Sequence, residues 1–335
     1  MKKLSINILI LIILGSVLSC TKDDPSGPSE NNNQLKWEAT TPFPGYIRES
    51  AAGFWIGDNF YTGLGWGYLD ENYQEGGFLN DFYEYNTLTK IWSKKAEFTG
   101  GGRIHGVAFS VGNKGYIGFG RSQVGHNIQE YKDLWEYDPS LDIWTNIGAY
   151  PQIEDGVVVF AKSYEVSGKV YITFGYDLWV FNSSDKSLTK IGPIPEYMIL
   201  TTGFEINGKI YIGTGGTPDY NYSFYEFDPS NGTWTKKTDF PGPERRFASS
   251  FALNGKGYIS CGEGRMSTAP SSYLMINLKD TWQYDPVSNL WTKLNDYPGS
   301  AYIDQVSSDS DSKAIVGTGH TTQTVHYGRD FWLVR

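Results

Sequence analysis

A recurring aromatic phrase constrains the fold of this chain more than any other feature of its sequence. FYEFDPSNGTWTK, from Phe224 to Lys236, has close variants that begin at Asp81, Asp133 and Thr281. The tryptophan that ends the phrase, replaced once by leucine, recurs at intervals of 44 to 57 residues, at Trp37, Trp92, Trp144, Leu188, Trp234 and Trp291. Such a period is typical of repeat architectures, in which each copy is a small unit that must stack on its neighbours to bury its apolar faces.

Each copy predicts four short β-strands. Residues 201–216 read TTGFEI, then Asn207-Gly208, then KIYIGTGG, and the next copy repeats this order around Asn254-Gly255. Asn-Gly between alternating apolar residues is a strong signal for a hairpin, because both turn residues take positive φ. Asp-Pro-Ser or Asn-Thr marks a second turn inside the aromatic phrase, and no helical period follows the N-terminal segment. Six such copies predict an all-β fold, a six-bladed β-propeller.

The two ends of the repeat region predict how the ring closes. Residues 330–335 match the third strand of a copy, and the sequence then stops. The missing fourth strand is found at Leu35-Lys36-Trp37-Glu38. We therefore expect the N-terminal strand to complete the last blade, which would remove the open sheet edge and make residues 35–335 one domain.

The motifs within each copy resemble the kelch repeat, over about residues 36 to 335. The resemblance rests on second strands that end in glycine, on the pattern [DN]-x-[WY]-x-[YF]-[DN]-P, and on a tryptophan six residues after its last aspartate. The double glycine usual in this family survives only as Gly215-Gly216, and the Trp-Asp dipeptide of the rival WD repeat does not occur. The resemblance implies the propeller fold but says little about function, because propellers carry many unrelated sites.

The N-terminal segment predicts export and a lipid anchor. Residues 1–19 place Lys2 and Lys3 before an apolar run that is short for a membrane-spanning helix, as in a secretory signal peptide. VLSC resembles the lipobox of bacterial lipoproteins, in which the cysteine, here Cys20, receives the lipid. An ordinary cleaved signal with an incidental cysteine is the alternative.

The residues after Cys20 predict a tether and a location. Residues 20–34 are polar and rich in proline, serine and asparagine, so they cannot fill a core. TKDD, residues 21–24, also resembles the export signal of surface lipoproteins in Bacteroidetes. We expect an extracytoplasmic protein at the outer membrane or cell surface, in contact with the membrane through its lipid anchor only.

Composition narrows the classes of ligand. The formal net charge of -9 argues against nucleic acid, because phosphate binding needs clustered Lys and Arg. Cys261 is the only cysteine besides Cys20, so we expect no internal disulfide, and Cys261 is predicted to be a buried apolar side chain.

Two positions of the repeat predict a binding rim around the propeller axis, on the face that carries the loops between the second and third strands. The first, near the start of each first strand, holds Arg48, Arg103, Asp155, Ile199, Arg245 and Tyr302; the second, after the glycine that closes the second strand, holds Trp66, Arg121, Tyr176, Gly216, Glu263 and His320. Arginines and aromatic rings suit a ligand with anionic groups and a sugar-ring face, and the kelch resemblance implies binding through arginines here. The alternative is that Arg48, Arg103 and Arg245 brace the blades by pairing with carbonyl groups or with Asp155 and Glu263.

The sequence contains no strong catalytic motif. The four histidines lack the close spacing of metal ligands, so no metal and no cofactor are predicted. A galactose oxidase would need a cysteine crosslink for which Cys261 is the sole candidate, and no surrounding motif supports it. Sialic acid mutarotase (N-acetylneuraminate epimerase), a six-bladed kelch protein, is the closer enzymatic resemblance, and it implies Glu263 and His320 as acid and base with Arg245 for the substrate carboxylate.

These observations lead to a primary expectation and to alternatives. We expect a non-catalytic binding module that engages a glycan or protein ligand through the loop face of the propeller. The alternative from a different class is a sugar-modifying enzyme of the sialic acid mutarotase type, and a purely structural scaffold is a third possibility.

Overall fold

The computed structural model describes residues 34–69, 75–196, 198–216, 221–269, 272–300, 303–310, 312–322 and 326–335. The predicted signal peptide, Cys20, nearly all of the tether and Tyr302 lie outside these residues. Every regular element that the structure describes is a β-strand, which confirms the predicted all-β fold. No helix in the described part of the chain is long and apolar enough to cross a membrane.

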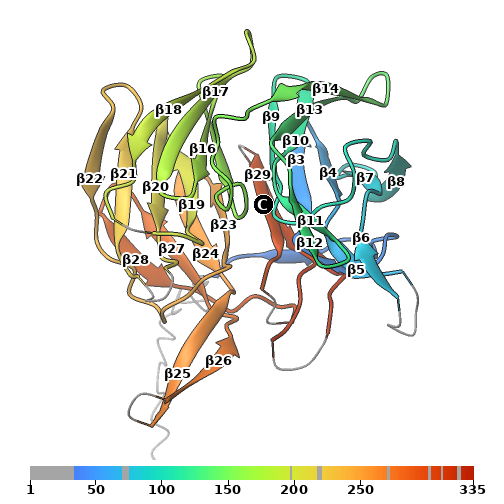
Figure 1. Ribbon diagram of the computed structural model, residues 1–335. Coiled ribbons are helices and arrows are strands. Elements are labelled where there is room, and N and C mark those ends of the chain that lie inside the picture. Colours follow the sequence, from blue (N-terminus) through green and yellow to red (C-terminus); the bar gives the residue numbers. More distant parts are fainter. Residues whose placement is uncertain are drawn as a thin grey trace, which may run out of the picture. The chain divides into compact units, whose positions relative to one another are not determined.

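Six antiparallel sheets of four strands form the blades, whose strands we letter a to d from the axis outward (Figure 1). Blades 1 to 3 consist of β3 (Ala52–Ile56), β4 (Asn59–Gly63), β7 (Phe82–Asn86) and β8 (Ile91–Lys95); β9 (Val107–Val111), β10 (Lys114–Gly118), β13 (Asp133–Asp138) and β14 (Ile143–Ala149); and β15 (Lys162–Val166), β16 (Lys169–Phe174), β17 (Asp177–Asn182) and β18 (Ser187–Pro193). Blades 4 to 6 consist of β19 (Thr202–Ile206), β20 (Lys209–Gly213), β21 (Phe224–Asp228) and β22 (Thr233–Lys236); β23 (Ser249–Leu253), β24 (Lys256–Ser260), β27 (Thr281–Asp285) and β28 (Leu290–Lys293); and β29 (Val306–Ser310), β30 (Lys313–Gly317), β31 (Phe331–Val334) and β1 (Trp37–Ala39).

The ring closes as the sequence predicts. β1 is the fourth strand of blade 6 and pairs with β31 in the register Trp37 to Val334 and Ala39 to Trp332. The first strands of neighbouring blades contact one another around the axis, and β29 of blade 6 contacts β3 of blade 1. The first and last described strands therefore lie in one sheet, and the propeller has no open blade edge at its seam.

Within the described residues, three of the loops between strands b and c form hairpins on one face, the lower one in Figure 1. In blade 1, β5 (Trp66–Tyr68) pairs with β6 (Gly76–Phe78) on one side and with the short β2 (Arg48–Glu49) on the other. Blade 2 carries β11 (Arg121–Val124) and β12 (Asn127–Glu130), and blade 5 carries β25 (Glu263–Ala269) and β26 (Ser272–Asn277). We call this side of the propeller the hairpin face.

The anchor tryptophans explain why the aromatic phrase recurs. The indole N–H of Trp92 donates to the carbonyl of Thr41, that of Trp144 to Ala96, and that of Trp291 to Thr238, at 3.0 to 3.1 Å. Each acceptor belongs to the segment that leaves the preceding blade, so each tryptophan links two blades. Edge-to-face contacts add to this link, as between Phe82 of blade 1 and Trp144 of blade 2 at 5.0 Å, a geometry worth about 0.5–1.5 kcal/mol beyond its buried area.

Close packing between blades also requires glycine, rather than a larger residue, at particular positions. A Cβ atom on Gly115 would lie 2.0 Å from the ring of Phe54, and one on Gly257 would lie 2.0 Å from the ring of Phe204. Both glycines occupy the second position of strand b, and both phenylalanines belong to strand a of the preceding blade. A side chain at either glycine would push neighbouring blades apart.

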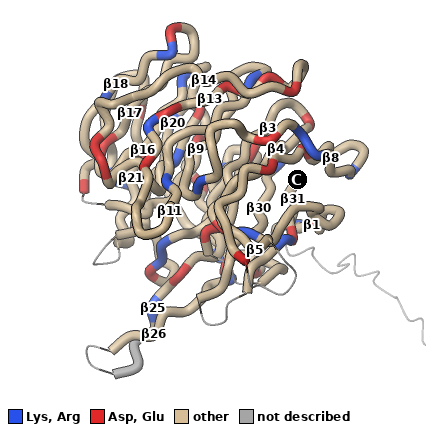
Figure 2. Tube along the Cα trace, turned by 45° about the vertical axis from the view of Figure 1, so that its right-hand side comes forward, with Lys and Arg blue, Asp and Glu red and all other residues tan. Residues whose placement is uncertain are grey.

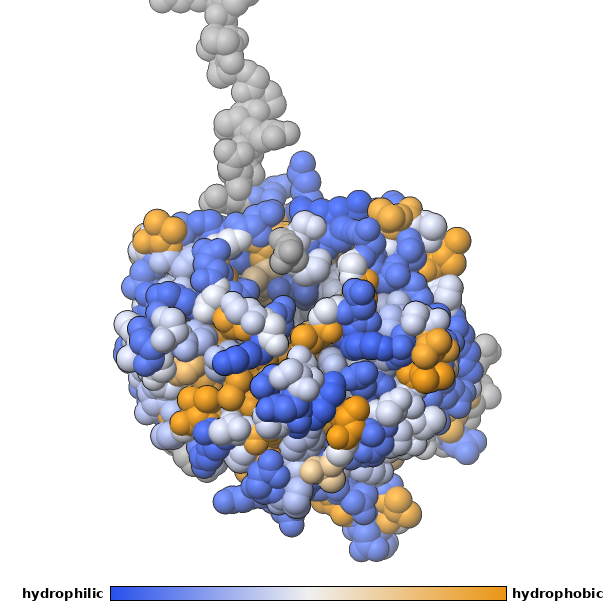
Figure 3. Space-filling view, turned by 90° about the horizontal axis from the view of Figure 1, so that it is seen from above, coloured by the Kyte–Doolittle hydropathy of each residue, from blue (hydrophilic) through white to orange (hydrophobic). Residues whose placement is uncertain are grey.

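The outer surface mixes charges and isolated apolar groups. Lys and Arg are interspersed with Asp and Glu over the molecule in Figure 2. On the face in Figure 3, which is opposite the hairpin face, the apolar residues lie in small separate groups among hydrophilic ones. Small scattered groups of this kind are normal on a protein surface and do not by themselves mark an interface.

Candidate functional site

Six residues with left-handed backbone form a ring around the axis. They are Ser50, His105, Phe160, Leu200, Phe247 and Asp304, one just before strand a of each blade, with φ between 53° and 60°. All six line a single cavity of about 80 Å³. A channel of about 230 Å³ between the a strands shares some of its lining residues. We call the smaller space the axial cavity. Non-glycine residues adopt positive φ at a cost, and such strain gathers at functional sites.

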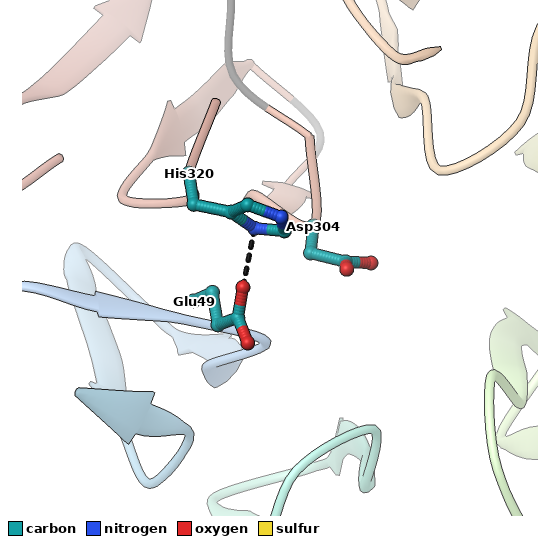
Figure 4. Close-up of side chains that lie close together, drawn as sticks. All are labelled: Glu49, Asp304 and His320. Carbon is teal, nitrogen blue, oxygen red and sulfur yellow. Dashed lines mark ion pairs between the residues drawn. The ribbon is translucent and has the colours of Figure 1, made fainter. Parts of the chain in front are cut away.

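Three ionisable side chains meet beside this ring, as Figure 4 shows. Glu49 precedes Ser50 of the ring, Asp304 is itself a ring member, and His320 follows the glycine after strand b of blade 6. Donor atoms of these three side chains lie within 4.8 Å of one another, and all three are partly buried. Blade 6 supplies two of them and blade 1 the third, so the cluster spans the seam of the ring.

Backbone hydrogen bonds hold the cluster in place. Ile303 and His320 exchange two N–H to carbonyl bonds of 2.8 and 3.0 Å, which fixes the segment before Asp304 against the histidine. The amide of Ser50 donates to the carbonyl of Asp304 at 2.9 Å, and Gly319 donates to the carbonyl of Arg48 at 2.8 Å. The side chains are therefore placed by paired main chain rather than by a free loop.

The charges of the cluster favour a protonated histidine. Nδ1 of His320 forms an ion pair with Oε2 of Glu49. Burial opposes the charged imidazole, but the Glu49 hydrogen bond, together with the negative charges of Glu49, Asp304 and Glu263, outweighs it and raises the pKa of His320. A proton donor and carboxylate acceptors thus lie side by side next to the axial cavity, which Asp304 lines, and this is the arrangement that general acid–base catalysis needs.

Aromatic rings line one side of the cluster. The ring of Tyr327 stacks on His320 at 5.7 Å and lies 5.5 Å from the ring of Trp66. Tyr68 contacts both Trp66 and Tyr327, at 5.0 and 5.3 Å. The predicted rim residue Trp66 therefore lies in an aromatic cluster next to His320.

The cluster also has the composition of a cation site. One imidazole and two carboxylates are a donor set that divalent cations accept. However, Nδ1 of His320 forms an ion pair with Glu49, so these two groups already have each other as partners. We therefore interpret the cluster as an acid–base group.

The three predicted rim arginines are not open to the rim. Arg48 and Arg245 are 0% exposed and Arg103 is 1% exposed. Each guanidinium donates to the aspartate that begins strand c or immediately precedes it, namely Asp81, Asp133 and Asp280, and to the carbonyl of Leu64, Phe119 and Cys261 respectively. The structure thus favours the bracing alternative, with partners other than the Asp155 and Glu263 we had considered, and it removes Arg245 as a ready ligand for a substrate carboxylate.

The other predicted residues lie in different environments. Glu263 is buried and pairs with Arg246 at 2.6 Å, but it lies close enough to His320 to influence its pKa. The side chain of Asp155 is 86% exposed and pairs with Lys132 at 2.7 Å, away from the cluster. Arg121 is partly buried on β11, and its guanidinium has no ion-pair partner among the described residues. Tyr176 is partly buried in the turn after β16.

Sequence reasoning missed Glu49 and Asp304 because it placed the axial position too early. In blades 1, 2 and 5 the ring residue lies two positions after the arginine, and in blade 6 it lies two positions after Tyr302. The signal was available in blade 2, where His105 follows Arg103 at this spacing. Of the predicted catalytic trio, only His320 lies in the cluster.

Comparison with known proteins points to one class of enzyme. No protein-family model matches the chain. The chain is 26% identical to N-acetylneuraminate epimerase of Pasteurella multocida over 263 residues, which cover 77% of this chain and 62% of that protein. N-acetylneuraminate epimerase of Yersinia enterocolitica is 33% identical over 93 residues, covering 28% of this chain and 23% of that protein. N-acetylneuraminate epimerase 1 of Escherichia coli O6:H1 is 30% identical over 135 residues, covering 40% and 35%.

These matches span less than two thirds of the length of the relatives. Among solved structures, that of YjhT superimposes with a TM-score of 0.72 at 15% identity, over 88% of this chain and 96% of the other, which supports the fold. Our prediction of a non-catalytic binding module is wrong, because the relatives are named as epimerases of an acidic sugar and favour the enzymatic alternative.

Proposed function

We propose that this protein is a mutarotase that interconverts the anomers of N-acetylneuraminate, or of a closely related acidic sugar, at the axial cavity. The observation that carries the proposal is the Glu49–His320 pair, a carboxylate and an imidazole held together beside a strained ring of axial residues. The similarity to N-acetylneuraminate epimerases supports the choice of substrate.

Mutarotation requires only proton transfers. A base takes the proton of the anomeric hydroxyl while an acid protonates the ring oxygen, and the bond from the anomeric carbon to the ring oxygen breaks to give the open keto form. After rotation about the adjacent bond, the reverse transfers close the ring on the other face of the carbonyl. No proton is gained or lost over the cycle, so the overall reaction is an isomerisation.

The residues of the cluster fit these two roles. His320 in its protonated form is the proton donor, and Glu49, its ion-pair partner, is the acceptor. Asp304 keeps a negative charge near the imidazole and so favours the protonated form before each transfer. Positioned acids and bases of this kind contribute roughly 10² to 10⁴ in rate.

The test is the rate of anomer exchange in N-acetylneuraminate, followed by NMR with the full-length chain against buffer alone. The proposal expects a rate above the spontaneous one that grows in proportion to protein concentration. A suitable control for unspecific acid–base effects is Asp155→Asn, because Asp155 is an exposed carboxylate away from the cluster.

We also propose that the protein works outside the cytoplasm on a lipid anchor at Cys20. The proposal is supported by the apolar leader and by the VLSC motif. Labelling of growing cells with a fatty-acid analogue tests it: the full-length chain should carry the label and Cys20→Ser should not.

A further inference from the structure

One lysine at the axial cavity takes no part in the proposed proton transfers. Lys162, the first residue of β15 in blade 3, lines both the axial cavity and the channel between the a strands. Its ammonium makes no hydrogen bond or ion pair with any residue that the structure describes. It is also partly buried, in a position where most lysines would have a partner.

Lys162 interacts electrostatically with the acid–base cluster through Asp304. Burial lowers the pKa of this lysine, and the negative charge of Asp304 acts in the opposite direction. Asp304 lies next to both groups: it shares the axial cavity with Lys162, and it belongs to the cluster of Glu49 and His320.

Other cations near the axis are less available. Arg48, Arg103 and Arg245 are buried in ion pairs with aspartates, and Arg246 is paired with Glu263. His105 lines the cavity, but its Nε2 lies 3.9 Å from Oδ2 of Asp304. Among the described residues that line the axial cavity, Lys162 is the cation that forms no ion pair.

The chemistry of the substrate requires such a cation close to the acid–base pair. In a 2-keto sugar acid the carboxylate is bonded directly to the anomeric carbon, so its binding group must lie within a few ångströms of the reacting atoms. A cavity of about 80 Å³ is too small for a sugar ring but accepts a carboxylate. A ring that rests outside, beside Trp66 and Tyr327, would direct its carboxylate into this space.

We propose that Lys162 binds the substrate carboxylate and makes the site selective for sugar acids that carry a carboxylate on the anomeric carbon. This inference rests on the proposed function. It assigns to Lys162 the role that sequence reasoning gave to Arg245.

A binding measurement tests the inference separately from turnover. N-acetylneuraminate and its methyl ester differ in the charge of the carboxyl group, and their affinities for the full-length chain are compared by ligand-observed NMR. We expect the acid to bind about ten- to a hundredfold more tightly than the ester. Lys162→Met should abolish this preference, Lys162→Arg should keep part of it, and Lys169→Met, at an exposed lysine of the same blade, should leave it unchanged.

Stability separates a binding lysine from a structural one. Because its ammonium has no partner among the described residues, Lys162→Met should melt at the same temperature as the wild type or higher. A variant that melts at a lower temperature and keeps the preference for the acid would overturn the inference. So would a wild type that binds acid and ester equally, or that binds neither.

The outcomes also distinguish the inference from the proposed function. A wild type that binds the acid through Lys162 but does not accelerate anomer exchange would keep the carboxylate site and refute the mutarotase. A wild type that accelerates exchange, with a KM that Lys162→Met leaves unchanged, would keep the mutarotase and refute the role of Lys162.

Discussion

Arg48 and Asp81 form a bidentate ion pair inside blade 1, with nitrogen to oxygen distances of 2.7 and 2.6 Å. The arginine also donates to the carbonyl of Leu64, at the end of strand b, at 3.0 Å. Its own carbonyl accepts a hydrogen bond from Gly319 of blade 6. One residue thus joins two strands of its blade through its side chain and the preceding blade through its backbone. Arg245 makes the same set of links in blade 5, with Asp280, Cys261 and Gly215 of blade 4.

Removal of one partner of this pair should strongly destabilise the propeller. Arg48→Ala leaves Asp81 buried without its counter-ion, and such a loss typically costs about 3–5 kcal/mol in the free energy of unfolding. Chemical denaturation of the purified variant measures this cost. Arg121→Ala is the matched control, because Arg121 is partly buried without an ion pair among the described residues, and it should change stability by less than about 1 kcal/mol. Equal stability of Arg48→Ala and the wild type would refute the bracing role.

Closure of the ring by β1 predicts a cooperative loss of structure on truncation at the N-terminal side. Deletion of residues 34–41 removes the fourth strand of blade 6 and the contacts of Trp37 with Phe251 and Tyr297, at ring distances of 5.9 and 5.2 Å. The edge of β31 would then be unpaired. We expect a clear fall in melting temperature in a single transition, recorded by calorimetry. A deletion variant that melts like the full chain would contradict closure by this strand.

Most of the fold could be predicted from the sequence because the repeat supplies the same evidence six times. Turn residues such as Asn207-Gly208 mark the hairpins locally, and the anchor tryptophans mark the period, so errors in one copy are corrected by the others. Ring closure followed from a missing strand at one end and an extra strand at the other. None of these inferences depended on the direction of an individual side chain.

The pair formed by His320 and Glu49 predicts a definite pH dependence. The pKa of His320 is raised in the folded protein, so the stability that the pair contributes is fully present below the unfolded-state pKa and is lost as the pH rises through the folded-state value. Glu49→Gln should therefore lower the free energy of unfolding more at about pH 6 than at about pH 9. Denaturation of both proteins across this range measures the difference.

A titration of the histidines checks the same pair directly. NMR of the imidazole protons should give a lower pKa for His320 in Glu49→Gln than in the wild type, because the variant lacks the hydrogen-bonded carboxylate. A pKa of His320 that is the same in both would show that Glu49 does not interact with the imidazole.

Cys261 should be inert in the folded protein. It is fully buried, and burial raises the pKa of its thiol to about 12, so the reactive thiolate is disfavoured. In a Cys20→Ser background, a thiol reagent should label less than about one tenth of the protein in native buffer and all of it in denaturant. Rapid labelling of the native protein would contradict the burial of this residue and its place in the interblade core.

The site was harder to predict than the fold because it depends on side-chain direction at irregular backbone. Arg48 and Ser50 are two residues apart, yet the first points into the blade and the second lines the axis through a left-handed turn. Ser50 has positive φ although it is neither glycine nor asparagine, so the sequence does not mark this turn. Glu49 and His320 are distant in sequence and meet only because the ring closes between blades 6 and 1. One sequence gives no evidence of such a contact until the ring is assembled.

Anomer exchange of N-acetylneuraminate by the full-length chain and three variants tests the central claim most directly. The account predicts that the wild type accelerates exchange, that Glu49→Gln and His320→Gln each reduce the catalysed rate by roughly 10² to 10⁴, and that Asp155→Asn matches the wild type. Exchange no faster than in buffer, or an undiminished rate in both cluster variants, would contradict it.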